Sequence, residues 1–234
     1  MQEEQSDKPK SANKIKIIVV GAIGVGKTCL IAHYQTGKFL AEIPSTCGSS
    51  FVQIKKVING KKYTLNLWDT AGQEKYNSLT KIFTKNANIV ILVYSIIDRE
   101  SFKSLNKWLK LVKEINGEDG YTLGVAANKS DLYKSSVVSD SEGQNFAKKN
   151  KAIWKSTSAK EDDGGIEELI DKLLEKYLEM QNNSNNPEYI KLSNSKNKKK
   201  KEGGCCKGKE KKNKVVEEND EKMEKELSIM KMVV

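Results

Sequence analysis

The 234-residue sequence has no apolar run of about eighteen residues, which excludes a transmembrane helix of ordinary length. The N-terminal stretch MQEEQSDKPKSANK lacks the apolar centre of a secretory signal, so we expect a cytoplasmic protein. The four cysteines are then expected to be reduced thiols, and Cys29 and Cys47 show no metal-ligand spacing. The single histidine, His33, has no nearby nucleophile in the sequence and is interpreted as structural.

The positive charge of the chain is concentrated near one end. The net charge is +10, and residues 196–214 hold ten lysines and two glutamates, a net charge of +8. Residues 215–234 hold six acids and three lysines, a net charge of −3. A lysine run attracts polyanions, and we interpret it either as a solvated tail or as a contact with an anionic membrane surface. Nucleic acid is disfavoured, because no aromatic residues are interleaved with the lysines.

Strands are predicted to alternate with helices from residue 14 to residue 180. The pattern predicts strands at 14–20, 51–58, 61–68, 89–95, 121–127 and 152–157. It predicts helices at 27–36, 101–115, 140–150 and 165–180. Asn59-Gly60 indicates a tight hairpin between the second and third strands. The fold class is therefore α/β, a doubly wound, mostly parallel, six-stranded sheet with helices on both faces.

The segment GAIGVGKT, Gly21 to Thr28, follows a strand and opens a helix, as a phosphate-binding loop does. Gly21 and Gly26 let the backbone approach phosphate, Lys27 is expected to reach the β- and γ-phosphates, and Thr28 offers its hydroxyl to Mg²⁺. By itself the motif does not separate ATPases, kinases and GTPases. The alternative to a phosphate-binding loop is a glycine-rich turn that matches the motif by chance. The candidate phosphate-binding residues are Gly24, Val25, Gly26, Lys27, Thr28 and Cys29.

The segment NKSDL, residues 128–132, follows a predicted strand at the edge where α/β sheets bind ligands. The Asp131 carboxylate can accept two hydrogen bonds from guanine, from N1–H and from the exocyclic amine, which adenine does not offer in that arrangement. Asn128 and Lys129 are expected to brace this loop. A second segment after the last strand is expected to close over the base and comprises Ser158, Ala159 and Lys160.

The segment DTAGQ, residues 69–73, also comes directly after a predicted strand. We expect Asp69 to hold Mg²⁺ through a water molecule and the Gly72 N–H to sense the γ-phosphate. Gln73 is the candidate catalytic residue, because a glutamine at this place can orient the attacking water.

Taken together, GAIGVGKT, Thr46, WDTAGQE, NKSD and SAK resemble the Ras superfamily of small GTPases, over about residues 14–180. The tryptophan before DTAGQE, the short loop after NKSDL and the paired cysteines resemble the Rab family. The segments GSSFVQIKK, QEKYNSL and GGIEEL resemble its early-endosome subgroup. The resemblance implies a GTP-binding domain at 14–180, GTP or GDP with Mg²⁺ as ligands, slow GTP hydrolysis and a role in vesicle traffic.

The resemblance also implies roles for single residues. Phe39 would stack on guanine, and Thr46 would bind Mg²⁺ and the γ-phosphate, although each can also be an ordinary packing or loop residue. Two switch segments, residues 38–50 and 69–80, would present the nucleotide state to effectors, exchange factors and activating proteins. The protein would act as a monomer that cycles to the cytosolic face of an intracellular membrane, endosomal if the subgroup resemblance holds.

Some residues depart from the family pattern. Ile23 stands where small GTPases carry a small residue, and we expect it to crowd the γ-phosphate and slow hydrolysis unless the loop widens. The segments CGSSF (47–51) and FTKNA (83–87) also depart from the pattern, and Ser95 stands where an aspartate is usual. We expect these changes to alter surfaces that meet effectors and regulators. The alternative function is a GTP-locked scaffold with the same fold and no turnover. A P-loop ATPase or kinase is a further alternative, which Asp131 and SAK disfavour.

The C-terminal region has an unusual order. Residues 1–13 are expected to be disordered and 181–204 to form a polar, basic tether that ends at Cys205 and Cys206, candidates for lipidation. A charged extension, residues 207–234, follows them, and it is either clipped, an artefact of how the coding sequence was read, or real. Its apolar spacing fits a short amphipathic helix or chance, at Met223, Leu227, Met230 and Val234.

Overall fold

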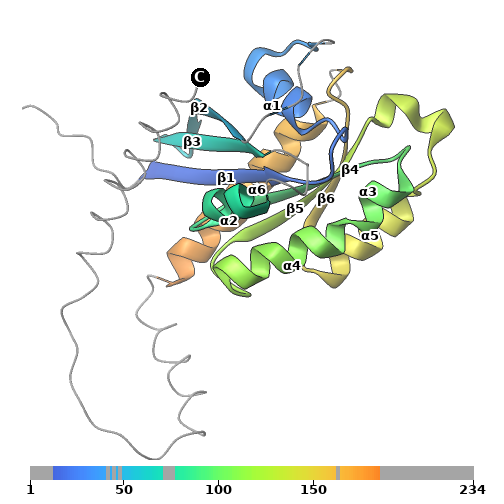
Figure 1. Cartoon of the computed structure of the whole chain (residues 1–234). Coiled ribbons are helices and arrows are strands. Elements are labelled where there is room, and N and C mark those ends of the chain that lie inside the picture. The colour runs from blue at the N-terminus through green and yellow to red at the C-terminus, as the bar shows by residue number, and fades with distance from the viewer. Residues whose placement is uncertain are drawn as a thin grey trace, which may run out of the picture. The chain divides into compact units, whose positions relative to one another are not determined.

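A computed structural model describes residues 13–40, 43, 46, 49–70, 77–161 and 164–184, all within the first of two units of the chain, Met1–Asn185 and Asn186–Val234. The strands are β1 (Lys14–Val20), β2 (Ser49–Ile58), β3 (Lys61–Thr70), β4 (Ile89–Ser95), β5 (Thr122–Asn128) and β6 (Ile153–Thr157). The helices are α1 (Lys27–Thr36), α2 (Asn77–Thr84), α3 (Arg99–Lys103), α4 (Leu105–Asn116), the 3-10 helix η3 (Ser130–Ser135), α5 (Asp140–Lys149) and α6 (Gly165–Ser184). They form the arrangement seen in Figure 1.

The six strands form one sheet in the order β2-β3-β1-β4-β5-β6. β1 lies in the interior and pairs in parallel with both β3 and β4, whereas β2 pairs antiparallel with β3. The turn between β2 and β3 has positive φ at both central residues, 49° at Asn59 and 74° at Gly60, the geometry of a two-residue hairpin. The predicted fold class, a mostly parallel sheet with one antiparallel edge strand, is confirmed.

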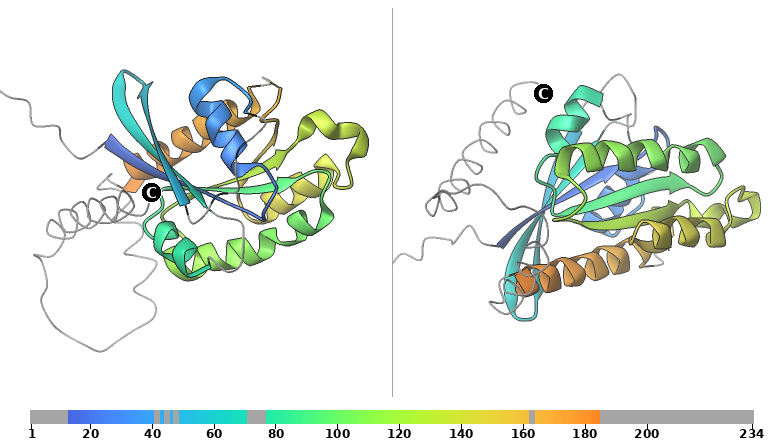
Figure 2. Two further views of the ribbon diagram at one scale, coloured as in Figure 1. Left: turned by 45° about the horizontal axis from the view of Figure 1, so that its top comes forward. Right: turned by 90° about the horizontal axis from the view of Figure 1, so that it is seen from below.

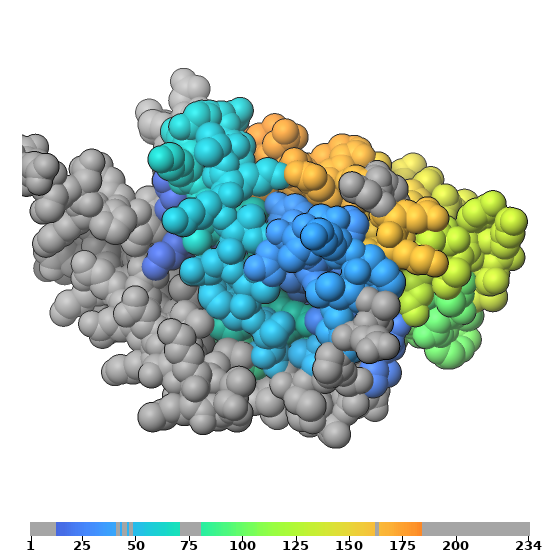
Figure 3. All heavy atoms as spheres, turned by 90° about the horizontal axis from the view of Figure 1, so that it is seen from above, coloured from blue at the N-terminus to red at the C-terminus, as the bar shows by residue number. Residues whose placement is uncertain are grey.

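Helices α1 and α6 cover one face of the sheet. Alternate residues of the parallel strands point to this face, and their apolar side chains pack against both helices. In Figure 3 the blue atoms of α1 lie between the β2–β3 hairpin and the orange segment that includes α6. The fit under α6 is close, since a Cβ on Gly124 would lie 2.6 Å from Cδ1 of Leu173.

Helices α2, α3, α4 and α5 belong to the opposite face, and the right-hand view of Figure 2 shows α4 and α6 on opposite sides of the sheet. Leu105, Trp108 and Val112 of α4 are buried, as the apolar spacing of that helix requires. At the end of the β2–β3 pair away from its turn, the Trp68 ring packs against two phenylalanines, with its centroid 4.8 Å from that of Phe51 and 5.2 Å from that of Phe83. The sheet is therefore covered by helices on both faces.

The structure differs from the sequence-based expectations in a few elements. α2 and η3 were not predicted, and the helix expected at 101–115 is instead two helices that meet at Ser104. Ser95, expected at a partner surface, is buried with 1% exposure, so that expectation was wrong. None of the helices in the described ranges is long and apolar enough to cross a membrane.

Candidate nucleotide-binding site

The candidate site lies at the carboxyl ends of the parallel strands. β1 runs directly into the loop that begins at Gly21, and β3 ends at Thr70 beside Asp69. β5 ends at Asn128 and β6 at Thr157, two neighbours in the register of the sheet. Parallel strands end at the same edge, so segments that are far apart in the sequence meet there.

Glycines let the phosphate loop pass close to the neighbouring backbone. A Cβ on Gly21 would lie 2.2 Å from the carbonyl oxygen of Val93, a distance that no side chain can occupy. Gly26 has a φ of 93°, in the left-handed region, and a Cβ there would lie 2.4 Å from Nδ2 of Asn128. Gly26 immediately precedes α1, so the first free N–H groups of the helix open onto this loop.

Lys27 is a buried cation within the loop. Its Nζ donates hydrogen bonds to the carbonyl oxygens of Gly21, at 3.0 Å, and of Ala22, at 2.9 Å. Burial lowers the pKa of Lys27 to about 8, against the opposing effect of the Asp69 charge. A phosphate group in the loop would supply the anion that favours the charged form of this lysine.

Three oxygen-bearing side chains from separate segments converge beside Lys27. Oγ1 of Thr28 donates to Oδ2 of Asp69 at 2.6 Å and lies 2.7 Å from Oγ1 of Thr46, which donates to the same carboxylate oxygen at 3.1 Å. Oδ1 of Asp69 is buried without a hydrogen-bond partner among the described residues. Burial raises the pKa of Asp69, and the hydrogen bonds from Thr28 and Thr46 oppose that rise. A small set of hard oxygen ligands suits Mg²⁺, which these three side chains would hold directly or through water.

A second group of polar residues lies at the ends of β5 and β6. Oγ of Ser158 donates to Oδ1 of Asp131 at 2.8 Å and accepts hydrogen bonds from the N–H groups of Lys160 and Glu161, both at 3.0 Å. Lys129 has a φ of 65°, which turns the chain sharply after β5. The Asp131 carboxylate is thus oriented by a buried serine.

Asn128 joins the two groups. Its Nδ2 donates to the carbonyl oxygen of Val25 at 2.7 Å, although the residues are 103 positions apart, and its Oδ1 accepts from Thr157 at 3.4 Å. The side chain is 1% exposed, so both contacts lie away from water. A displacement of the loop after β5 would therefore also displace the phosphate loop.

The other candidate residues occupy different surroundings. The side chains of Ile23 and Phe39 are 54% and 42% exposed, whereas Ala159 is buried in the core under α6. Cys29 is half-buried in α1, and burial raises the pKa of its thiol. Four candidates lie outside the described residues: Gly72, Gln73, Cys205 and Cys206.

The Ras family model matches residues 16–179 of this chain. The sequence is 44% identical over 144 residues to "Ras-related protein Rab-11B" of Dictyostelium discoideum, a match that spans 62% of this chain and 65% of the relative. Rab-12 of Mus musculus is 35% identical over 172 residues, spanning 73% of this chain and 70% of the relative. Rab-30 of Homo sapiens is 37% identical over 155 residues, spanning 66% and 75%.

The chain belongs to the Ras family. The relatives named above are Rab proteins, so it is a Rab-type small GTPase, as its motifs predicted. Membership supports GTP hydrolase activity over the GTP-locked scaffold.

Sequence reasoning missed parts of this Rab-type site that depend on tertiary contacts. The acceptor for Asn128 is a backbone carbonyl in the phosphate loop, which no motif specifies. Thr157 precedes the SAK segment and was not singled out, yet its hydroxyl is buried against Asn128. A threonine at the last position of a strand gave no distinctive signal.

Proposed function

We propose that this Rab-type protein binds GTP and GDP with Mg²⁺ in the described site and hydrolyses GTP slowly. The convergence of the Thr28, Thr46 and Asp69 oxygens beside Lys27 is the observation that supports this proposal most strongly. The loop amides and Lys27 would hold the phosphates, and the two threonines and Asp69 would hold the metal, directly or through water. Bound Mg²⁺ neutralises charge on the phosphate oxygens.

Guanine selectivity is proposed to come from Asp131. Its carboxylate, held by Ser158, would accept from the N1–H and the exocyclic amine of the base. A site built around such hydrogen bonds strongly disfavours a base that leaves them unmade. Ala159 and Lys160 would line the same pocket, and Phe39 would cover the base from the other side.

Hydrolysis is proposed to proceed by attack of a water that Gln73 orients. Ile23, more than half exposed at the rim of the loop, would crowd the γ-phosphate side and slow both basal turnover and stimulation by an activating protein. Thr46 connects the first switch segment to Thr28 and Asp69, so loss of the γ-phosphate and its metal contact would release that segment. Gly72 would report the same loss in the second switch.

We propose that the two switch states recruit different partners in vesicle traffic, as the Rab resemblance implies. Effectors, exchange factors and activating proteins would bind the switch segments. The membrane would be reached through the basic tether and lipidated Cys205 and Cys206, and an early-endosome compartment is proposed on the subgroup motifs alone. Mass spectrometry of the C-terminal peptide from native cells tests this: an unmodified peptide ending at Val234 would contradict lipid anchoring.

Nucleotide competition tests the binding proposal. We expect GTP and GDP to displace a fluorescent guanine nucleotide, and ATP to fail even at about 1,000-fold excess. Asp131→Asn should weaken GTP and favour xanthine nucleotide, whose oxygen can accept from an amide. Equal displacement by ATP and GTP would point to a different nucleotide class.

Single-turnover hydrolysis tests the roles of Gln73 and Ile23. Gln73→Leu should lower the rate by about 10-fold or more, since it removes the group that orients water. Ile23→Gly should raise it, with and without an activating protein. If Ile23→Gly produces no gain, the loop tolerates the isoleucine and the crowding argument fails.

A further inference from the structure

A second cavity lies at the opposite end of β5 from the nucleotide site. It has a volume of about 320 Å³, and its wall includes Thr122, the first residue of β5, whereas Asn128 is the last. At about 3.3 Å per residue, β5 separates this cavity from the base-binding loop by roughly 20 Å. The rest of its wall comes from α4, α5 and α6, from Leu123 of β5, and from the loops that precede β5 and β6. It is therefore not part of the GTP site.

Four lysines, from three helices and one turn, line this cavity. The four are Lys113 near the end of α4, Lys149 at the end of α5, Lys151 before β6 and Lys176 on α6. Two acids, Glu118 and Asp119, lie on the same wall, so the charged lining has a net charge of +2. Glu118 lies 2.8 Å from Lys113 and neutralises that lysine. Lys149, Lys151 and Lys176 have no ion pair within the described part of the chain.

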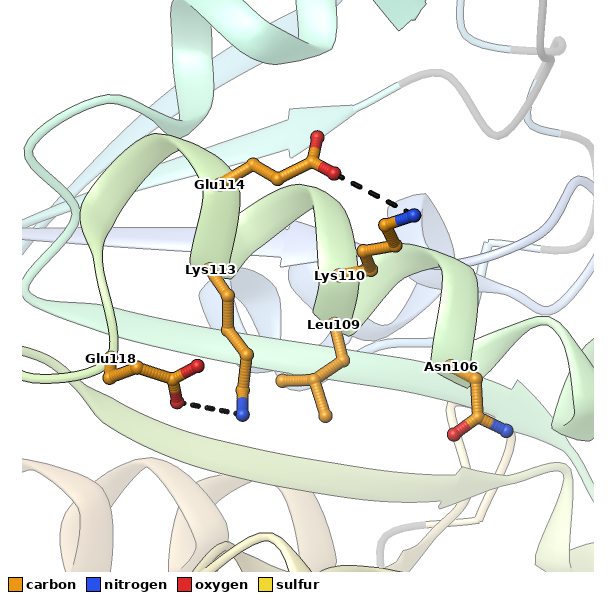
Figure 4. A pocket seen from close by; sticks show the side chains of 6 residues that line it. All are labelled: Asn106, Leu109, Lys110, Lys113, Glu114 and Glu118. Atoms are coloured by element: carbon orange, nitrogen blue, oxygen red, sulfur yellow. Dashed lines mark ion pairs between the residues drawn. The ribbon is translucent and has the colours of Figure 1, made fainter.

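A shallower hollow on the outer face of α4 provides a comparison (Figure 4). Its two lysines both lie opposite glutamates, Lys113 opposite Glu118 and Lys110 opposite Glu114, the latter pair at 4.0 Å. The positive charge on that surface is thus already matched. The cavity beyond it, in contrast, is lined by three lysines for which the described residues provide no ion pair.

The turn before β6 includes one of these lysines and holds the ammonium group of another. Nζ of Lys176 donates to the carbonyl oxygen of Lys151 at 2.9 Å, which holds its ammonium at the turn and leaves two N–H donors. Lys151 itself has a φ of 55°, a conformation that glycine or asparagine usually occupies. The turn geometry therefore does not explain a lysine at this position.

A neutral donor completes the wall. Burial raises the pKa of Tyr121, and the charges of Glu118 and Asp119 raise it further, so its hydroxyl keeps its proton at neutral pH. Ammonium groups and a phenol O–H suit phosphate oxygens, and the volume fits one small ligand rather than a polymer. We propose that this cavity is a second anion site, which binds a phosphorylated headgroup through Lys149, Lys151 and Lys176.

The ligand is either a lipid headgroup or a free phosphate ester, which share this chemistry. The first source would place the end of α6 at a membrane. Met180 of α6 lines the cavity, and Cys205 follows it by 25 positions in the sequence. The site itself does not depend on lipidation or on the GTPase activity.

Binding is tested on the full chain saturated with GDP and Mg²⁺, so that the nucleotide site is occupied. Inositol trisphosphate is titrated while amide NMR signals are followed, and we expect saturable shifts at Tyr121–Leu123 and Asn150–Ala152. Lys149→Gln combined with Lys176→Gln should weaken binding by at least about tenfold. Lys151→Asn, which suits the turn, should weaken it without changing the thermal stability.

The matched control is Lys61→Gln with Lys62→Gln, two exposed lysines on the hairpin. This variant should bind as the unmodified chain does. If the shifts appear only in residues 185–234, or if the cavity variants bind as well as the control, the proposal is overturned.

Vesicles distinguish the two sources. Recruitment to phosphatidylcholine vesicles that depends on added phosphatidylinositol bisphosphate, and that the cavity variants reduce, supports the site with a lipid headgroup as ligand. Saturable binding of soluble inositol trisphosphate without such recruitment supports the site with a free phosphate ester.

Discussion

The ammonium group of Lys27 faces two carbonyl oxygens in a buried loop, and burial lowers its pKa to about 8. Phosphate oxygens in the loop would favour the charged lysine, so nucleotide binding should take up a proton above that pH. We therefore expect the affinity for GDP to fall as the pH rises from 8 to 9, by up to about tenfold. Isothermal titration in buffers of different ionisation enthalpy measures the proton uptake.

The variant Lys27→Arg separates proton uptake by Lys27 from titration of the guanine base. A guanidinium stays charged throughout this range, so the variant should bind GDP without the lysine-linked proton uptake. An unchanged proton uptake in Lys27→Arg would assign the pH dependence to another group.

Gly26 is the other residue where local geometry makes a sharp prediction. Gly26→Ala combines left-handed backbone strain of about 1–2 kcal/mol with disruption of the Asn128–Val25 hydrogen bond, worth about 1–3 kcal/mol when buried. We expect a loss of about 2–5 kcal/mol in the free energy of unfolding and a strong loss of GDP affinity. Denaturant unfolding and nucleotide titration measure the two effects.

Gly37→Ala is the matched control. Gly37 has a similar left-handed φ of 66°, but a Cβ there meets nothing within 4 Å. The Gly37→Ala variant should lose only about 1–2 kcal/mol of unfolding free energy, from backbone strain, and its GDP affinity should be unchanged. Equal losses in the two variants would show that the contact with Asn128 contributes nothing.

For single residues, the sequence predicted which residues form the site better than it predicted their hydrogen-bond partners. GAIGVGKT predicts a phosphate loop because glycine, lysine and threonine are needed at those positions, and the structure gathers Lys27, Thr28 and Asp69. The bond from Asn128 to Val25 was not predictable, since it depends on how β1 and β5 sit in the sheet. The burial of Ser95 likewise follows from the helices that cover β4, which its own identity does not reveal.

Among the elements, α5 shows how a helix end is held to its surroundings. Ser139 and Glu142 form a capping box, and Arg99 pairs with the Glu142 carboxylate. The hydrogen bond from Arg99, with those from Ser139, lowers the pKa of Glu142 to about 2. A carboxylate with a lowered pKa stabilises the fold above its ordinary pKa, and that stability is lost as the pH falls from about 4.5 to about 2.

Glu142→Gln should therefore reduce the acid dependence of stability in this window. Glutamine can still occupy the capping box, so the variant should fold, and its unfolding free energy should fall less steeply with acid. Thermal unfolding between pH 2.5 and 5 makes the comparison.

Arg99→Gln is the control, because it removes the cation and leaves the carboxylate. The double variant should show no more loss of acid dependence than Glu142→Gln alone. If the losses of acid dependence in the two single variants add up in the double variant, Arg99 is not the charge partner of Glu142.

Element positions were predicted where periodicity was strong. Asn59-Gly60 indicated the hairpin because both residues tolerate positive φ, and the structure has that geometry. The helix expected at 101–115 is interrupted because Asp98 caps a short first helix and Ser104 ends it, a break that apolar spacing alone does not reveal. α2 was missed because it has only eight residues, so Leu79, Ile82 and Phe83 show the helical spacing over little more than one turn.

For the molecule as a whole, α6 provides a large part of the core. Ile166, Leu169, Ile170, Leu173 and Leu174 are each at most 6% exposed. Burial of five such side chains contributes roughly 8–15 kcal/mol, comparable to the entire stability of a domain. A chain that ends at Gly164 should therefore not fold, as circular dichroism and analytical gel filtration would show.

A chain that ends at Ser184 is the matched comparison. It keeps every described helix and strand, so with GDP bound its melting temperature should lie within about 2 °C of the full chain. A larger decrease would mean that residues 185–234 stabilise the domain.

The order of the strands has a consequence for how the chain acquires its fold during synthesis. β1 is made first and lies inside the sheet, and β4, β5 and β6 are added outward on one side in the order in which they are translated. Each of these strands finds its neighbour already in place, but the apolar face under α6 is covered only after residue 174 has left the ribosome. Until then the nascent chain leaves that face exposed, and chaperones and other unfinished chains bind exposed apolar surface. Synthesis of α6, the last helix in the described part of the chain, thus ends the period in which this apolar face is prone to aggregate.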